Sequence, residues 1–294
     1  MPRAAIRVLL SVVVSLPFAA AATAGASQAY LDARLVVNAI LPRPISALTG
    51  SAFAKSLTGM DDATRETAIR TQFLEGNLPA FLRTLKPVGL MGRSADGKTM
   101  TATIFVMPDY LAIGSDGDFL RVPMRLSTAT EIAREFHCVL PTKKMVDAIF
   151  AQADLRLAPE PLPPGPQMRS TAYYLQHNRL IEAQRLAVGR PLGGLLSGQK
   201  KDLVLTNRLT RLPGRLAIYG WHRPTGIPIQ PLSTVHGARY EDYSHGIRLV
   251  SDTLLLDGAP RSVYAVLADP RLAPLLSDEG PIREARGLMG AAQP

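Results

Sequence analysis

The stretch APEPLPPGP, residues 158–166, divides the sequence into two parts of different character. Proline fixes the backbone φ angle and has no N–H to donate, so this stretch cannot continue a helix or the ladder of a sheet. We expect an extended, polyproline-like crossing here. It separates an N-terminal part, residues 27–157, from a C-terminal part, residues 167–294.

The N-terminal part contains clear helix signals. Residues 61–75 read DDATRETAIRTQFLE, with Asp61 or Asp62 placed to cap the first turn and Gly76 placed to end the last. These signals predict a helix over residues 61–75.

Two further helices and a hairpin are expected before the crossing. Thr128 and Glu131 form a capping box, which predicts a helix that runs to about residue 136. Pro141 and Thr142 indicate the start of another helix, so Cys138 should lie just before a helix N-terminus. Alternation over residues 99–113 and a second run at 119–124, joined by an Asp-Gly-Asp turn, predict a β-hairpin.

The C-terminal part reads mainly as strands. Residues 171–188 predict one helix, in which His177 is expected at the surface. Strands are predicted at 202–206, 215–220, 227–230 and 248–256. Helices followed by strands, without regular βαβ alternation, indicate an α+β fold in which both parts pack as one globular unit.

The first 26 residues resemble a secretory signal peptide. Arg3 and Arg7 precede an apolar run from Val8 to Ala22, and small residues follow where a signal peptidase cuts. That run is shorter than the roughly 20 apolar residues of a membrane-spanning helix. We therefore expect a secreted or periplasmic protein with no membrane span after cleavage.

The net charge indicates a class of partner, and the cysteine content excludes a disulfide within the chain. Removing Arg3 and Arg7 lowers the formal charge from +9 to +7, with basic residues spread along the whole chain. This net positive charge is suited to binding an anionic envelope polymer or surface. No nucleic-acid-binding motif appears in the sequence. Cys138 is the only cysteine, so no disulfide forms within the chain.

One C-terminal segment has an unusual composition. Residues 219–248 contain three of the five histidines, the only tryptophan and three tyrosines. The predicted catalytic residues are, with Cys138 from the N-terminal part, His222, His236, Asp242 and His245. A carboxylate beside an imidazole can orient it and hold its tautomer, which general acid–base catalysis requires.

The first mechanism that this set allows is cysteine hydrolysis. A thiol at a helix N-terminus and close to lysines is easier to ionise, so Cys138 would be the nucleophile. His222 would be the general base, oriented by Asp242 or His236. A thiol before a helix and a histidine on a later strand resemble the layout of papain-like and NlpC-type cell-wall peptidases, although FHCVLPTKK departs from their local sequence.

The second mechanism uses a metal. His222, His236, Asp242 and His245 could be ligands for zinc, with one position left open to water. The Ser233-x-x-His236 pattern followed by Asp242 is similar to the spacing in zinc D-Ala-D-Ala peptidases. In the first mechanism no cofactor is needed, and no nucleotide-binding motif is present.

A third resemblance concerns residues 244–249, SHGIRL. They are similar to the SHGCIR signature of L,D-transpeptidases, which are exported cell-wall enzymes. Gly246 is followed directly by Ile247 here, so the position of that family's nucleophilic cysteine is absent. Without that sulfur, the reaction of the family does not carry over to this chain.

These observations predict an exported hydrolase that acts on an envelope polymer or peptide. The same aromatic and cationic side chains could instead form the groove of a non-catalytic protein that binds carbohydrate or peptide. In either case the residues expected to contact the substrate are Lys200, Lys201, Trp221, Tyr240, Tyr243 and Arg248.

Overall fold

The computed structural model describes residues 39–93 and 97–290, and its mixture of helices and sheets confirms the predicted α+β class. The predicted signal peptide, residues 1–26, lies outside the described residues. Within the described ranges, no helix has the length and apolar character needed to cross a membrane.

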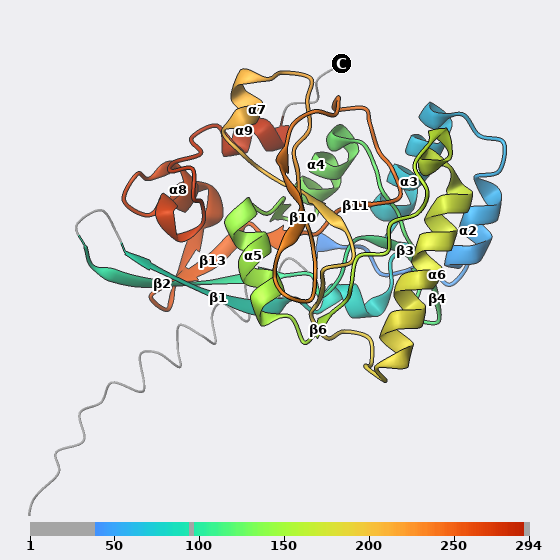
Figure 1. Cartoon of the computed structure of the whole chain (residues 1–294), viewed down its shortest axis with the longest axis horizontal. Helices are drawn as coiled ribbons and strands as arrows, with labels where there is room; N and C mark the ends of the chain where they lie inside the picture. The colour runs from blue at the N-terminus through green and yellow to red at the C-terminus, as the bar shows by residue number, and fades with distance from the viewer. Residues whose placement is uncertain (1–38, 94–96, 291–294) are drawn as a thin grey trace, which may run out of the picture.

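A six-stranded antiparallel sheet is built from both parts of the sequence (Figure 1). Its strand order is β14-β13-β2-β12-β5, and β1 pairs with the other side of β2. The strands are β1 (Lys86–Arg93), β2 (Thr99–Val106), β5 (Cys138–Val139), β12 (Val250–Ser251), β13 (Thr253–Leu256) and β14 (Ala259–Ser262). The pairing of β2 with β12 and β13 joins the N-terminal and C-terminal parts into one structure.

The predicted hairpin differs from the observed pairing. Residues 99–106 form β2, whose hairpin partner is β1, while β3 (Ala112–Ser115) and β4 (Asp118–Arg121) form a separate short hairpin. Pro108 and Asp109 lie in the break between β2 and β3, and proline cannot donate to a ladder. The long β1–β2 hairpin projects from one side of the molecule in Figure 1.

A second sheet has the order β10-β9-β8-β11. Its strands are β8 (Lys201–Leu203), β9 (Ile218–His222), β10 (Pro228–Ser233) and β11 (His245–Gly246), and β8 and β11 run parallel. The remaining pair, β6 (Leu155–Arg156) and β7 (Leu196–Ser197), is also parallel. The second sheet therefore gathers the strands that carry the predicted site.

Two helices begin where their capping residues predict. The Asp61 carboxylate accepts from Thr64 N at 2.8 Å, and Thr142 Oγ1 accepts from Met145 N at 3.2 Å. The helices are α2 (Gly50–Ser56), α3 (Asp62–Leu74), α4 (Leu126–Glu135), α5 (Lys143–Gln152), α6 (Thr171–Ala187), α7 (Arg208–Arg211), α8 (Val263–Ala268) and α9 (Ala285–Gly290). Three 3₁₀ turns are η1 (Ala80–Arg83), η2 (Pro166–Arg169) and η3 (Ala273–Leu275).

The capping box predicted for α4 is wrong. The N-cap is Arg125, so Thr128 already lies inside the helix. Glu131 instead forms an ion pair with Arg70 on α3. The helix itself forms because its apolar face packs into the core, with Ala129, Ile132 and Ala133 buried.

The proline-rich crossing contains no helix or strand between residues 158 and 164. It is anchored by Tyr243, whose hydroxyl accepts from Leu162 N at 2.7 Å and lies 3.2 Å from Leu162 O. After the crossing, α6 runs along the opposite side of the molecule from the β1–β2 hairpin (Figure 1).

Candidate functional site

The second sheet brings together three segments that are distant in sequence. His245 pairs with Lys201 across the parallel β11–β8 ladder, and Lys201 pairs with Gly220 across the antiparallel β8–β9 ladder. The strands thus place residues 200–202, 219–222 and 243–246 side by side. Most of the predicted site residues lie on these three segments or on the loop before β11.

Trp221 and His222 are neighbours on β9 but have different surroundings. The Trp221 ring contacts Lys201, whose Nζ lies 4.9 Å from the ring centroid. The His222 ring stacks on Phe150 of α5 at 4.6 Å, and its Nε2 lies 3.1 Å from Asp147 Oδ1. The carboxylate that contacts His222 is therefore Asp147, and not Asp242 as the sequence suggested.

The His–Asp cluster, which we define as His236, Tyr240, Asp242, Ser244 and His245, lies at the β11 end of the second sheet. The rings of His236 and Tyr240 stack at 4.1 Å, and the His236 and His245 rings are 5.6 Å apart. Asp242 Oδ2 accepts from Tyr240 Oη at 3.0 Å, while Asp242 Oδ1 accepts from Ser244 N at 2.8 Å and from Ser244 Oγ at 2.6 Å. These bonds fix the orientation of the Asp242 carboxylate.

His245 is the innermost imidazole of the His–Asp cluster. It is fully buried, and within the described residues neither of its ring nitrogens has a hydrogen-bond partner. Burial lowers the pKa of His245 to about 4, although the nearby Asp242 carboxylate acts in the opposite direction. His245 is therefore neutral at pH 7 and can both donate and accept a hydrogen bond.

Asp242 remains ionised despite its burial. Burial raises the pKa of this carboxyl, but His245 and the hydrogen bonds from Ser244 outweigh that effect and lower the pKa overall. Asp242 Oδ2 lies 3.9 Å from His245 Nε2, just beyond hydrogen-bond distance. A carboxylate and a neutral imidazole therefore face each other across a short gap.

A buried lysine lies beside the His–Asp cluster. Lys200 Nζ donates to the Tyr243 carbonyl oxygen at 2.6 Å and lies 3.4 Å from His177 Nδ1. Burial and the charge of Arg121 lower the pKa of Lys200 to about 7. Because its ammonium group is enclosed, Lys200 cannot reach a substrate in solution, whereas the half-buried Lys201 can.

His177 is a member of this polar core that the sequence analysis missed. It is fully buried, with its ring 5.0 Å from Tyr243 and 6.4 Å from Trp221, so it does not lie at the surface of α6. Burial and the charge of Lys200 lower its pKa to about 2. The spacing of Tyr174, His177 and Ile181, which share one face of the helix, is the sequence signal that could have identified it.

Several polar atoms of this region are buried without partners. His177 Nε2, Trp221 Nε1 and both ring nitrogens of His245 belong to this group in the described part of the chain. Buried polar groups are nearly always hydrogen-bonded to protein or to ordered water. The concentration of four such atoms in one region indicates a place where water or a ligand binds.

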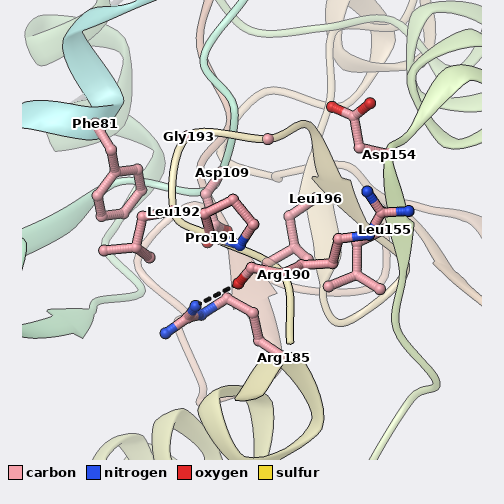
Figure 2. A pocket seen from close by; sticks show the side chains of 11 residues that line it. Phe81, Asp109, Asp154, Leu155, Arg185, Arg190, Pro191, Leu192, Gly193 and Leu196 are labelled. Carbon is pink, nitrogen blue, oxygen red and sulfur yellow. Dashed lines mark hydrogen bonds between the residues drawn. The ribbon is translucent and has the colours of Figure 1, made fainter. Parts of the chain in front are cut away.

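A small cavity of about 100 Å³ lies at the far end of the same polar network (Figure 2). Asp109 lines this cavity and accepts from Arg121 Nε at 2.9 Å and from Gln199 Nε2 at 3.0 Å. Gln199 precedes Lys200, so the network joins the cavity to the polar core. No predicted site residue is among the residues that line it.

Arg248, which was expected to hold an anionic substrate, has a different role. It is fully buried, donates to the carbonyl oxygens of Met107 at 2.9 Å and Leu196 at 2.5 Å, and covers the ring of Tyr110. These contacts join the segment between β11 and β12 to β7 and to the loop after β2. Arg248 is therefore a structural residue that a substrate cannot reach.

Cys138 does not have the surroundings of a nucleophile. It lies on β5, paired with Ser251, and is only 1% exposed. Burial raises the pKa of the thiol far above its usual range, with a further contribution from the charge of Asp252. The helix that follows begins at Lys143, as predicted, but the pKa of the thiol is raised, which is the opposite of the expected activation by a helix N-terminus.

The predicted zinc ligands do not converge either. His222 contacts Asp147 and Phe150, whereas His236, Asp242 and His245 belong to the His–Asp cluster. Among residues 39–93 and 97–290, no group of three or more His, Cys, Asp or Glu side chains is arranged to hold a metal ion. The donor set therefore does not fit the zinc site that the sequence suggested.

Comparison with protein-family models, with curated proteins and with solved structures finds no match for this chain. The resemblances to cell-wall peptidases and L,D-transpeptidases therefore rest on the short sequence patterns alone.

Proposed function

We propose that this protein is an exported hydrolase of an envelope polymer or peptide, and that its reaction uses His245 and Asp242 in place of Cys138. The observation that supports this proposal is the pairing of an unpartnered, neutral imidazole with an ionised carboxylate at 3.9 Å. Such a pair can move a proton to and from a bound water.

The proposed reaction is attack of water on an acyl carbon of the substrate. His245 takes one proton from the water while its oxygen bonds to the carbonyl carbon. Asp242 stabilises the imidazolium that forms. His245 then gives the proton to the leaving amine or alcohol as the acyl bond breaks, so the imidazole returns to its neutral state.

Three side chains next to His245 would contact the substrate first. Lys201, His236 and Tyr240 are half-buried and adjoin the fully buried His245, so the proposed reaction requires them to move aside before a substrate can reach that imidazole. Burial lowers the pKa of Lys201, while Asp242 favours its charged form. A cation over Trp221 and a stacked His236–Tyr240 pair are suited to an anionic polymer with planar amide groups.

A non-catalytic binding protein is the second candidate. It is favoured by the complete burial of His245, because binding needs only the half-exposed Lys201, His236 and Tyr240. In that case the buried His–Asp cluster would only support the binding surface.

The deciding experiment incubates the purified mature protein with isolated cell-wall sacculi and with a peptide library. Products are separated by chromatography and identified by mass spectrometry. Parallel samples contain a metal chelator or a thiol-alkylating reagent. The proposal predicts new products in all samples, while loss of products after alkylation or chelation would overturn it. Retention of sacculi without products, weakened in Lys201→Met, would favour the binding protein.

A further inference from the structure

A second cavity, of about 510 Å³, is lined in part by the loop that carries His236 and Tyr240. Residues 237–239 form one wall, the start of α4 forms another, and the turn after α7 closes the third. Backbone hydrogen bonds hold the three walls together: Leu126 N donates to Ala238 O at 3.2 Å, and Ala238 N donates to Gly214 O at 2.8 Å. The volume of the cavity is in the range of small-molecule sites, about 300–1,000 Å³.

The cavity has an apolar side. Four leucines line it, namely Leu126, Leu209, Leu212 and Leu288. Leu212 is 41% exposed, although it lines a concave surface. Exposed leucine within a cavity indicates apolar surface that a ligand could cover.

The cavity also has a cationic side. Arg125, Arg215 and Arg239 line it, and none of its described lining residues is acidic. Within the described chain none of these three arginines forms an ion pair, and Arg125 Nε is buried without a hydrogen-bond partner. Glu66 accepts from the backbone nitrogen of Arg125 at 2.9 Å but does not line the cavity. Asp61 and Glu66 interact electrostatically with Arg125 from outside the cavity, while the lining itself combines three arginines with apolar surface.

We propose that this cavity binds a small anionic amphiphile, a carboxylate attached to an alkyl chain. The guanidinium groups hold the carboxylate through charge-assisted hydrogen bonds, and the leucines cover the chain. A site of this kind is independent of the proposed hydrolysis, since its residues are not part of the His–Asp cluster.

The test is calorimetric titration of the mature protein with dodecanoate below its micelle concentration. Dodecanol and dodecyltrimethylammonium, which have the same chain, are the matched probes for charge. We expect dodecanoate to bind one-to-one and at least tenfold more tightly than either. Amide NMR shifts should locate the ligand at Leu126, Gly214 and Gly237.

Three variants decide whether the cavity is the site. Arg239→Glu and Leu212→Asp change exposed or half-exposed positions and should weaken dodecanoate binding by about tenfold or more. Arg223→Glu makes the same charge change at an exposed position outside the cavity and should leave the affinity within about twofold. Equal binding of the cationic probe, no binding of dodecanoate, or equal loss in Arg223→Glu would each overturn the proposal.

Discussion

The Nε2 atom of His245 lies 3.9 Å from Oδ2 of Asp242, and within the described structure no group hydrogen-bonds to either nitrogen of that ring. A carboxylate held by Ser244 and Tyr240 cannot move freely toward the imidazole. The gap is therefore kept open by the surrounding hydrogen bonds. A bound water or a substrate atom could bridge it.

If His245 and Asp242 act together in hydrolysis, changing either removes the proton transfer. We expect His245→Asn and Asp242→Asn each to lower kcat by about 10²–10⁴-fold, the usual contribution of general acid–base catalysis. The measurement is product formation under saturating substrate, with folding checked by circular dichroism. His137→Asn changes an exposed histidine and is the matched control. Full activity in folded His245→Asn would contradict the assignment.

Removal of the Cys138 thiol should leave activity unchanged. The side chain is buried, and Sγ donates to the Phe136 carbonyl oxygen at 3.3 Å, so its contribution is to packing. We expect Cys138→Ala to lower the free energy of unfolding by about 1–2 kcal/mol. Iodoacetamide should modify the thiol only in denaturant. Rapid labelling of the folded protein would restore the thiol mechanism.

Loss of a buried arginine ion pair should destabilise the protein much more than loss of an exposed one. Arg121 is 1% exposed and pairs with Asp109 at 2.5 Å and Glu182 at 2.8 Å. Its replacement leaves the buried Asp109 carboxylate without a charged partner, so Arg121→Met should cost about 3–5 kcal/mol. Arg70→Met, which removes a more exposed pair with Glu131, should cost at most about 1 kcal/mol. Urea denaturation of both variants measures the difference.

Two histidines should make the protein sensitive to acid. The pKa of His245 is lowered to about 4 and that of His177 to about 2, both mainly by burial, from 6.5. The unfolded chain therefore binds protons more readily as pH falls below 6.5. Each histidine should remove about 1.5 kcal/mol of stability between pH 6.5 and 5.

Histidine NMR signals test this directly, since both imidazoles should stay neutral from pH 8 to 5. Burial raises the pKa of Asp202 to about 6, which opposes the loss of stability over part of this range. Stability should therefore be compared between the native chain and His245→Asn, whose difference isolates one histidine. A native His245 signal that titrates near pH 6.5 would contradict the prediction.

Local signals in the sequence predicted the starts of helices α3 and α5 well. Asp61 and Thr142 cap α3 and α5 where expected, because a capping bond joins residues only three apart. The capping box of Thr128 and Glu131 failed because a partner on another helix, Arg70, binds Glu131 instead. Strand β1 was missed because its KPVGLMGR sequence has two glycines and a proline, and its partner strand was assigned elsewhere.

The candidate site was only partly predictable. The composition of residues 219–248 identified His236, Tyr240, Asp242 and His245 correctly as neighbours. It could not show that His222 lies against Asp147, because that contact joins residues 75 positions apart. The exclusion of Cys138 depends on its burial between strands, which a single sequence does not reveal.

The chain passes from one sheet to the other within a single buried segment. His245 and Gly246 form β11 in the second sheet, and Val250 and Ser251 form β12 in the first. Between them, Ile247 O accepts from Leu111 N at 2.8 Å and Leu249 O accepts from Met107 N at 2.9 Å. A ligand that restricts the motion of His245 should therefore slow amide hydrogen exchange in the six-stranded sheet. Binding at the site could then be detected on strands that do not contact the ligand.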